Sequence, residues 1–175
     1  QVLFNGKDVY ALSDKEMRDM RTKMQIIFQD PFSSLQPRMP VGEIIGEAVR
    51  EHGLVSKEEF DDYIDQVMDN CGLQPFHKDR YPHEFSGGMR QRVAVLRAMR
   101  MDADFLLLDE PFRGLDAGTK KKTMNYIRRK GKEKTILLVT HDLEEAEAMG
   151  DWICTCSRLD GILEIKRNRK SSTEI

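Results

Sequence analysis

Apolar residues change their spacing along the chain near Pro82, and this change predicts two kinds of structure. After Pro82, short continuous apolar runs alternate with stretches of helical spacing. The predicted strands are 105–108, 135–139, 152–156 and 161–165, and the predicted helices are 87–100, 116–129 and 142–149. Uninterrupted Leu, Ile and Val strands that alternate with helices indicate a parallel sheet covered by helices. We therefore predict an α/β fold with right-handed crossovers.

The stretch from Val41 to Tyr81 lacks this alternation, and its pattern predicts helices only. Apolar residues share one helical face over 41–50, and a second helix follows a Ser56–Glu59 capping box and ends at Gly72. The second helix carries four aspartates that would suit a metal site or a solvated face, and we favour the solvated face: Asp61, Asp62, Asp65 and Asp69. We expect this stretch to form a separate helical lobe.

The first 30 residues predict a hairpin, a short polar helix and a strand. Asn5-Gly6 is a strong two-residue hairpin turn. The flanking strands are 2–4 and 9–10, the helix is 13–21, and the strand is 24–28. Because the chain opens at Gln1 inside this pattern, we interpret it as a fragment or a processed piece.

Composition narrows the class of protein. Of the 175 residues, 39% are hydrophobic and 33% are charged, which is enough apolar material for a core, and the net charge is −2. That balance argues against a main role in binding nucleic acid or coating an anionic membrane. No apolar run approaches the ~20 residues of a membrane span.

Cysteine and the C-terminal charge pattern add two smaller expectations. Three cysteines without framework spacing favour a reducing compartment, hence the cytosol. Cys154-Thr155-Cys156 would make half a metal site, but two neighbouring strand cysteines are the preferred interpretation. The basic stretch 166–170 is expected to be a frayed tail rather than a nucleic-acid arm.

Acidic residues follow the predicted strand 105–108. Asp109 and Glu110 stand where the carboxyl ends of parallel strands bind ligands in α/β folds. An acid in this place can hold Mg²⁺, and the next can polarise an attacking water. The alternative is a strand whose terminal acids face water.

Polar residues at three other element ends offer related chemistry. Ser86-Gly87-Gly88 precedes a helix whose free N–H groups could bind phosphate, although Ser86 is also a good N-cap. His141 follows the strand 135–139 and could touch a phosphate or a catalytic water, although a lone histidine more often satisfies local backbone groups. Gln29 ends another strand and could bind Mg²⁺, or be a surface residue. Asp142 and Glu145 look like a capping box.

The order of these features resembles the nucleotide-binding domain of ABC-type ATPases over nearly the whole chain. The segments 28–35 and 80–88 look most like the oligopeptide, dipeptide and nickel importer branch, whereas 109–112 and 140–146 look closer to other importer branches. The resemblance implies a P-loop NTPase-like, mostly parallel sheet with helices on both faces and an inserted helical subdomain. It divides the chain into a partial N-terminal core (1–40), a helical subdomain (41–85), a signature helix with RecA-like core (86–165) and a basic flexible tail (166–175).

The resemblance also implies roles for the residues of the strand ends. Asp109 matches the Walker B aspartate that binds Mg²⁺, Glu110 the general base, and His141 the switch histidine near the γ-phosphate of ATP. Gln29 matches the Q-loop glutamine, which contacts Mg²⁺ and senses the transmembrane partner.

Two further matches lie at subunit contacts of the family. Ser86, Gly87 and Gly88 match the signature motif, which closes on ATP held by the opposite subunit, and Asp116 matches the D-loop aspartate. Met89 departs from the usual glutamine, and 112–114 departs from a Thr-Ser-Ala-like run. The chain has no Gly-x-x-x-x-Gly-Lys-Ser/Thr phosphate loop, so we expect that N-terminal portion of the family to be missing.

Three functions follow as expectations from this resemblance. The first is the ATP-hydrolysing subunit of an importer for peptide or nickel-like cargo, which uses ATP and Mg²⁺, pairs with a second nucleotide-binding domain and binds permease subunits, but no nucleic acid. It would be cytoplasmic and peripheral on the inner face of the cell membrane. The second is a soluble twin-cassette ATPase such as a metalloenzyme-activating component. The third is a non-catalytic fragment that supplies only a signature face, and we expect this chain alone to be inactive.

Overall fold

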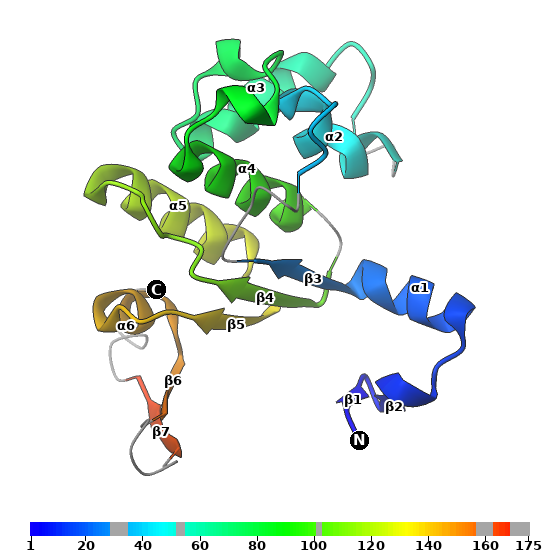
Figure 1. The fold of residues 1–175 in the computed structure, drawn as a ribbon, viewed down its shortest axis with the longest axis vertical. Helices are drawn as coiled ribbons and strands as arrows, with labels where there is room; N and C mark the ends of the chain where they lie inside the picture. Colours follow the sequence, from blue (N-terminus) through cyan, green and yellow to red (C-terminus); the bar gives the residue numbers. More distant parts are fainter. Residues whose placement is uncertain (29–34, 52–54, 101–102, 157–162, 169–175) are drawn as a thin grey trace.

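The computed structural model describes residues 1–28, 35–51, 55–100, 103–156 and 163–168 (Figure 1). Its centre is a parallel sheet of three strands in the order β3 (Met24–Ile27), β4 (Phe105–Asp109) and β5 (Thr135–Val139). In register, Ile27 lies opposite Leu108, and Leu108 lies opposite Leu138. The predicted parallel α/β sheet is therefore confirmed, and it brings strand 24–28 beside two strands that lie far along the sequence.

The helices that the chain forms between β3 and β5 lie on one side of this sheet, as Figure 1 shows. α4 (Gly87–Arg100) is the central helix, and it packs against both β3 and α2 (Val41–Glu51). Most of its apolar side chains are buried, which explains why its sequence is apolar around much of its circumference. α3 (Phe60–Asn70) packs on α2, and α5 (Ala117–Lys130) connects β4 to β5.

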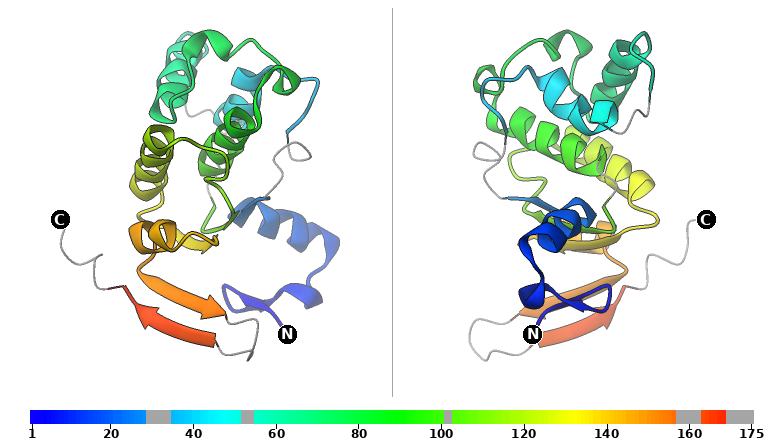
Figure 2. Two further views of the ribbon diagram at one scale, coloured as in Figure 1. Left: turned by 60° about the vertical axis from the view of Figure 1, so that its left-hand side comes forward. Right: turned by 90° about the vertical axis from the view of Figure 1, so that its right-hand side faces the viewer.

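Two small hairpins lie at the opposite end of the molecule from α2 and α3 (Figures 1 and 2). β1 (Leu3–Phe4) and β2 (Lys7–Asp8) pair around Asn5 and Gly6, which both have positive φ, as a two-residue hairpin turn requires. The expected strand at Val9–Tyr10 is wrong, because Val9–Ala11 forms a 3₁₀ helix capped by the Asp8 carboxylate. α1 (Asp14–Lys23) follows and starts with a Ser13–Glu16 capping box.

The second hairpin corrects the expectation of a frayed tail for residues 166–168, whereas residues 169 and 170 lie outside the described ranges. β6 (Trp152–Cys156) pairs with β7 (Leu163–Arg167), so Lys166 and Arg167 lie in a strand. Asn168 is buried, and its side-chain amide donates 2.7 Å hydrogen bonds to the carbonyls of Glu147 and Gly150. These bonds anchor the hairpin to α6 (Leu143–Met149). The basic composition of this segment gave no indication that Asn168 attaches it to α6.

The side chains on the two faces of the sheet differ in their exposure to solvent. Leu106 and Leu108 share one face of β4 and are 0% exposed. Side chains on the other face are open, with Ile26 48% and Leu137 52% exposed. Among the described residues, the second face therefore carries apolar side chains that are only half covered.

Across these same described ranges, no helix combines the length and the apolar character that a membrane crossing requires.

Candidate functional site

The carboxyl ends of β4 and β5 bring two predicted site residues together. Asp109 and Val139 are the last residues of their strands and lie opposite each other in the sheet. The next backbone group along, the N–H of Glu110, donates a 2.9 Å hydrogen bond to the Val139 carbonyl. Parallel pairing thus places Glu110 beside His141, although 31 positions separate them in the chain.

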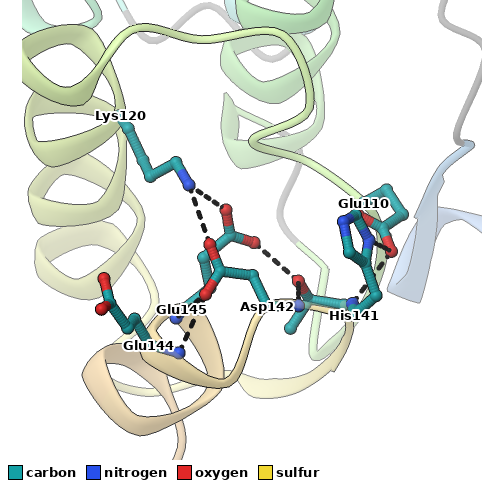
Figure 3. Close-up of polar contacts among 7 residues, drawn as sticks. Glu110, Lys120, His141, Asp142, Glu144 and Glu145 are labelled. Carbon is teal, nitrogen blue, oxygen red and sulfur yellow. Dashed lines mark hydrogen bonds and ion pairs between the residues drawn. The ribbon is translucent and has the colours of Figure 1, made fainter.

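Glu110 and His141 form a direct pair (Figure 3). One carboxylate oxygen of Glu110, Oε1, accepts the backbone N–H of His141 at 3.0 Å and lies 2.7 Å from its Nδ1. Because an ionised carboxylate only accepts hydrogen bonds, Nδ1 carries a proton and Nε2 of the neutral ring is left as an acceptor. The hydrogen bond and charge of Glu110 raise the pKa of His141 above its ordinary value.

The backbone of Glu110 is unusual. Its φ is +48°, in the left-handed region that L-residues rarely occupy. Its carbonyl accepts a 3.2 Å hydrogen bond from the N–H of Arg113 and a 3.4 Å bond from the side chain of Gln91, which lies on α4. These contacts fix the turn that aims the carboxylate at His141.

Charged and polar side chains surround the residues on either side of His141. The Thr140 hydroxyl donates a 2.6 Å hydrogen bond to Glu145, and Lys120 forms ion pairs with both Asp142 and Glu145 (Figure 3). The expected capping box is half right. Asp142 caps the N–H groups of Glu144 and Glu145, but the Glu145 carboxylate turns to Thr140 and Lys120 instead of returning to the cap.

The signature residues form the start of α4, and their two glycines differ. The Ser86 hydroxyl accepts the N–H of Met89 at 3.3 Å, so it caps the helix. A Cβ on Gly88 would lie 2.9 Å from the Gly114 carbonyl oxygen, too close for any side chain. A Cβ on Gly87 would meet nothing within 4 Å. Gly88 therefore allows a close backbone contact within this chain, whereas Gly87 leaves the helix start open.

Asp116 begins α5. Its carboxylate accepts the N–H of Thr119 at 3.0 Å, and this bond holds the pKa of Asp116 below its ordinary value. In this chain the residue is an exposed N-cap. A pocket of about 550 Å³ lies between the loop that precedes Asp116 and the loop that carries His141. The pocket walls come from these loops, α5 and α6. They include Glu110, Phe112–Leu115, Lys120, His141, Asp142 and Glu145.

A protein-family model described as "ABC transporter" matches residues 1–113 of the chain. The chain belongs to the ABC transporter family. Its fold agrees with this assignment, because 95% of the chain superimposes on 72% of a solved chain with a TM-score of 0.77 and 26% identity. That chain comes from a dimeric post-hydrolysis state of the ATP-binding cassette MJ0796 bound to ADP and Pi.

Curated relatives of this ABC transporter chain carry peptide-import names. It is 41% identical over 157 residues to the oligopeptide transport ATP-binding protein OppF of Bacillus subtilis, covering 87% of this chain and 52% of the relative. It is 40% identical over 156 residues to a putative peptide import ATP-binding protein of Brucella ovis, covering 88% and 48%. The chain therefore spans about half the length of these relatives.

The structure describes only some of the residues that are predicted to bind ATP and Mg²⁺ in this ABC transporter chain. Gln29 lies outside the described residues. Asp109 is half-buried at the strand end, and the described residues contain no group of three or more His, Cys, Asp or Glu that could hold a metal. A single carboxylate still fits Mg²⁺ in a nucleotide site, because this ion takes most of its other ligands from phosphate and water.

Two other sequence motifs have structural explanations. Gly6-Lys7 belongs to the β1–β2 hairpin, so it is not a phosphate loop. Of the helix aspartates, Asp61 and Asp65 pair with Lys78. Sequence reasoning missed Lys120 and Glu145 as neighbours of the site, and the only available signal was the position of Lys120 one turn after Asp116.

Proposed function

We propose that this chain is part of the ATP-hydrolysing subunit of an ABC importer whose cargo is a peptide. The observation that carries the proposal is the Glu110–His141 pair at the carboxyl edge of the sheet, in a chain about 40% identical to peptide import ATP-binding proteins. A glutamate and a histidine held 2.7 Å apart are suited to orienting a water molecule. The names of the relatives favour peptide over nickel-like cargo.

In the proposed reaction, water attacks the γ-phosphorus of ATP, and the bond between that phosphorus and the bridging oxygen of ADP breaks. Glu110 orients the water and accepts its proton. His141 receives a hydrogen bond at Nε2 or, when protonated, donates one to a γ-phosphate oxygen. Asp109 would hold Mg²⁺, which when bound supplies positive charge to the phosphate oxygens.

The signature residues act in trans in this proposal. Ser86, Gly87 and the free N–H groups at the start of α4 would bind the γ-phosphate of a nucleotide held by a second nucleotide-binding domain. Asp116 would contact that second domain. The exposure of Ser86, Gly87 and Asp116 supports this role.

The test of the site is Glu110→Gln in the full-length protein. ATP affinity should stay within about twofold, and turnover should fall at least about 100-fold, because the water loses its proton acceptor. Glu144→Gln is the matched control, since Glu144 is an exposed neighbour on α6. Turnover that survives in Glu110→Gln would refute the role given to Glu110.

The chain alone is a different case, because its 175 residues contain no phosphate loop. We propose that it does not bind ATP tightly by itself and that it can supply a signature face to a partner's nucleotide. Most triphosphate contacts in this class come from the loop's backbone N–H groups and lysine. Calorimetric titration of this chain with ATP tests the point, and a sub-millimolar Kd would refute it.

A second pocket supports the proposed membrane partner. It has a volume of about 390 Å³ and begins at Leu35, directly after the Gln29 segment. The other lining residues come from the loop after Leu35, α2 and α4: Gln36, Pro37, Met39, Ile44, Glu47 and Arg97. We propose that permease subunits dock here and hold the protein at the inner face of the membrane. Glu47→Arg should then weaken co-purification with the permease, while Glu110→Gln should not.

A further inference from the structure

We infer that Lys120 is a positioning residue for His141, which it holds in place through the buried carboxylate of Glu145. The inference rests on the proposed ATP hydrolysis for its functional meaning. Its structural content concerns only contacts within this chain. It joins α5, which begins at the Asp116 turn, to the loop that carries His141.

His141 needs such support because its own side chain is not packed. The ring is 82% exposed, so its direction depends on the bonds to Glu110 and on the backbone that carries it. An exposed ring held by one hydrogen bond, through Nδ1, turns away easily if the backbone that carries it shifts.

Both neighbours of His141 in the chain are held by a single hydroxyl. The Thr140 Oγ1 accepts the N–H of Asp142 at 3.1 Å and donates to Glu145 Oε2 at 2.6 Å. These hydrogen bonds fix the backbone on both sides of His141. The position of the Thr140 hydroxyl depends on Glu145, because the Glu145 carboxylate accepts the hydrogen bond from that hydroxyl.

Glu145 in turn depends on Lys120. The Glu145 side chain is only 6% exposed, and a buried carboxylate without a counter-charge is strongly unfavourable. Lys120 pairs with its other oxygen, Oε1, and reaches Asp142 Oδ2 at 3.2 Å. The hydrogen bond from Lys120 lowers the pKa of Asp142, and the bond to Glu145 raises the pKa of Lys120, so Asp142 and Lys120 both stay charged.

The position of Lys120 connects the Asp116 turn to the loop that carries His141. It lies one helical turn after the Asp116 N-cap, and it lines the same pocket as Glu110 and His141. A change at the Asp116 turn therefore reaches His141 through Lys120. Lys121 and Lys122 follow it on α5 but are exposed, so they provide matched controls of equal charge.

Kinetics of the full-length protein give the first test. Lys120→Met should lower kcat for ATP about tenfold or more while KM stays within about twofold, because alignment and not binding is lost. Lys120→Arg should restore most of the rate, and Lys121→Met should match the wild type. Lys120→Met/Glu145→Gln should be no slower than Lys120→Met, because it no longer buries an unpaired carboxylate. Equal loss in Lys121→Met, or no rescue by Lys120→Arg, would overturn the inference.

Nitrogen-15 NMR of the histidine rings in the same proteins gives a test that does not need turnover. Wild-type His141 should show the neutral form protonated at Nδ1, and folded Lys120→Met should shift toward protonation at Nε2. Unchanged His141 signals in folded Lys120→Met would overturn the inference even if turnover fell. If Lys120→Met does not fold, the double variant is measured in its place. A wild type without ATPase activity would refute the proposed function, while the ring signals would still decide the positioning role.

Discussion

The two faces of the central sheet have similarly apolar sequences but different surroundings. On one face, Leu106 and Leu108 are completely buried. On the other face, Ile26, Leu137 and Val139 are about half exposed. Leu3 and Trp152, which lie on the two hairpins, are also exposed. A strand pattern therefore specifies which side chains can be buried, and the packing of other elements determines which of them are buried. Parallel strands normally have cover on both faces.

Cysteine reactivity should show the largest contrast between the two sides. Cys71 lies in the helical core, and burial raises the pKa of its thiol to about 12. Cys154 and Cys156 are exposed on β6. In native protein at pH 8, we expect iodoacetamide to modify Cys71 at least about 100-fold more slowly than the hairpin pair. Peptide mass spectrometry measures this, and denatured protein, in which all three react alike, is the control. Similar native rates would contradict the described burial.

Truncation of leucine should separate the faces by stability. Leu106→Ala should lower the free energy of unfolding by about 3 kcal/mol, because Leu106 is fully buried and its truncation leaves a cavity in the core. Leu137→Ala should cost less than about 1 kcal/mol, since Leu137 is half exposed. Urea unfolding of this chain, followed by circular dichroism, measures both. Equal losses would mean that the second face is packed in solution.

A charge on the open face should change association more than stability. Leu137→Lys should reduce self-association and the binding of a hydrophobic dye, because it interrupts an exposed apolar patch. Lys121→Gln is a control on an exposed helix. Light scattering over a concentration series checks the expectation. If Leu137→Lys unfolds the chain, the face has a partner that the described residues do not show.

The smallest effect concerns pH at the rim between the two faces. Glu110, and to a lesser degree Glu145 and Asp142, raise the pKa of His141 above 6.5 in the folded chain, against the lowering effect of burial. A group with a raised folded pKa adds stability below its unfolded pKa and loses it as pH rises through the folded pKa. The free energy of unfolding should therefore fall slightly from pH 6 to pH 8. Glu110→Gln should reduce this slope, and an unchanged slope would contradict the pairing.

Much of the sheet could be predicted from the sequence, because runs such as Phe105–Leu108 and Thr135–Val139 have strand length and sit between helices. The boundaries of α4 also agree with prediction. Adjacency of Glu110 and His141 follows from parallel strands that end at one edge. Roles for Asp109, Ser86 and Asp116 stay predictions, and Gln29 lies outside the described residues.

The rest depended on interactions that periodicity does not encode. Lys120 and Glu145 are far apart in the chain, and their meeting depends on how α5 and α6 pack. The anchoring role of Asn168 depends on two carbonyls at the end of α6. The sequence could not predict which sheet face is buried, because the strands are equally apolar on both faces.

The left-handed backbone of Glu110 lowers the stability of the chain, and it directs the carboxylate toward His141. An L-residue at φ +48° costs on the order of 1 kcal/mol, whereas glycine adopts it freely. Glu110→Gly should remove this backbone cost but also the two hydrogen bonds from His141, and Glu110→Gln should retain the conformational cost. Backbone preference alone would therefore select against the residue that we assign to hydrolysis.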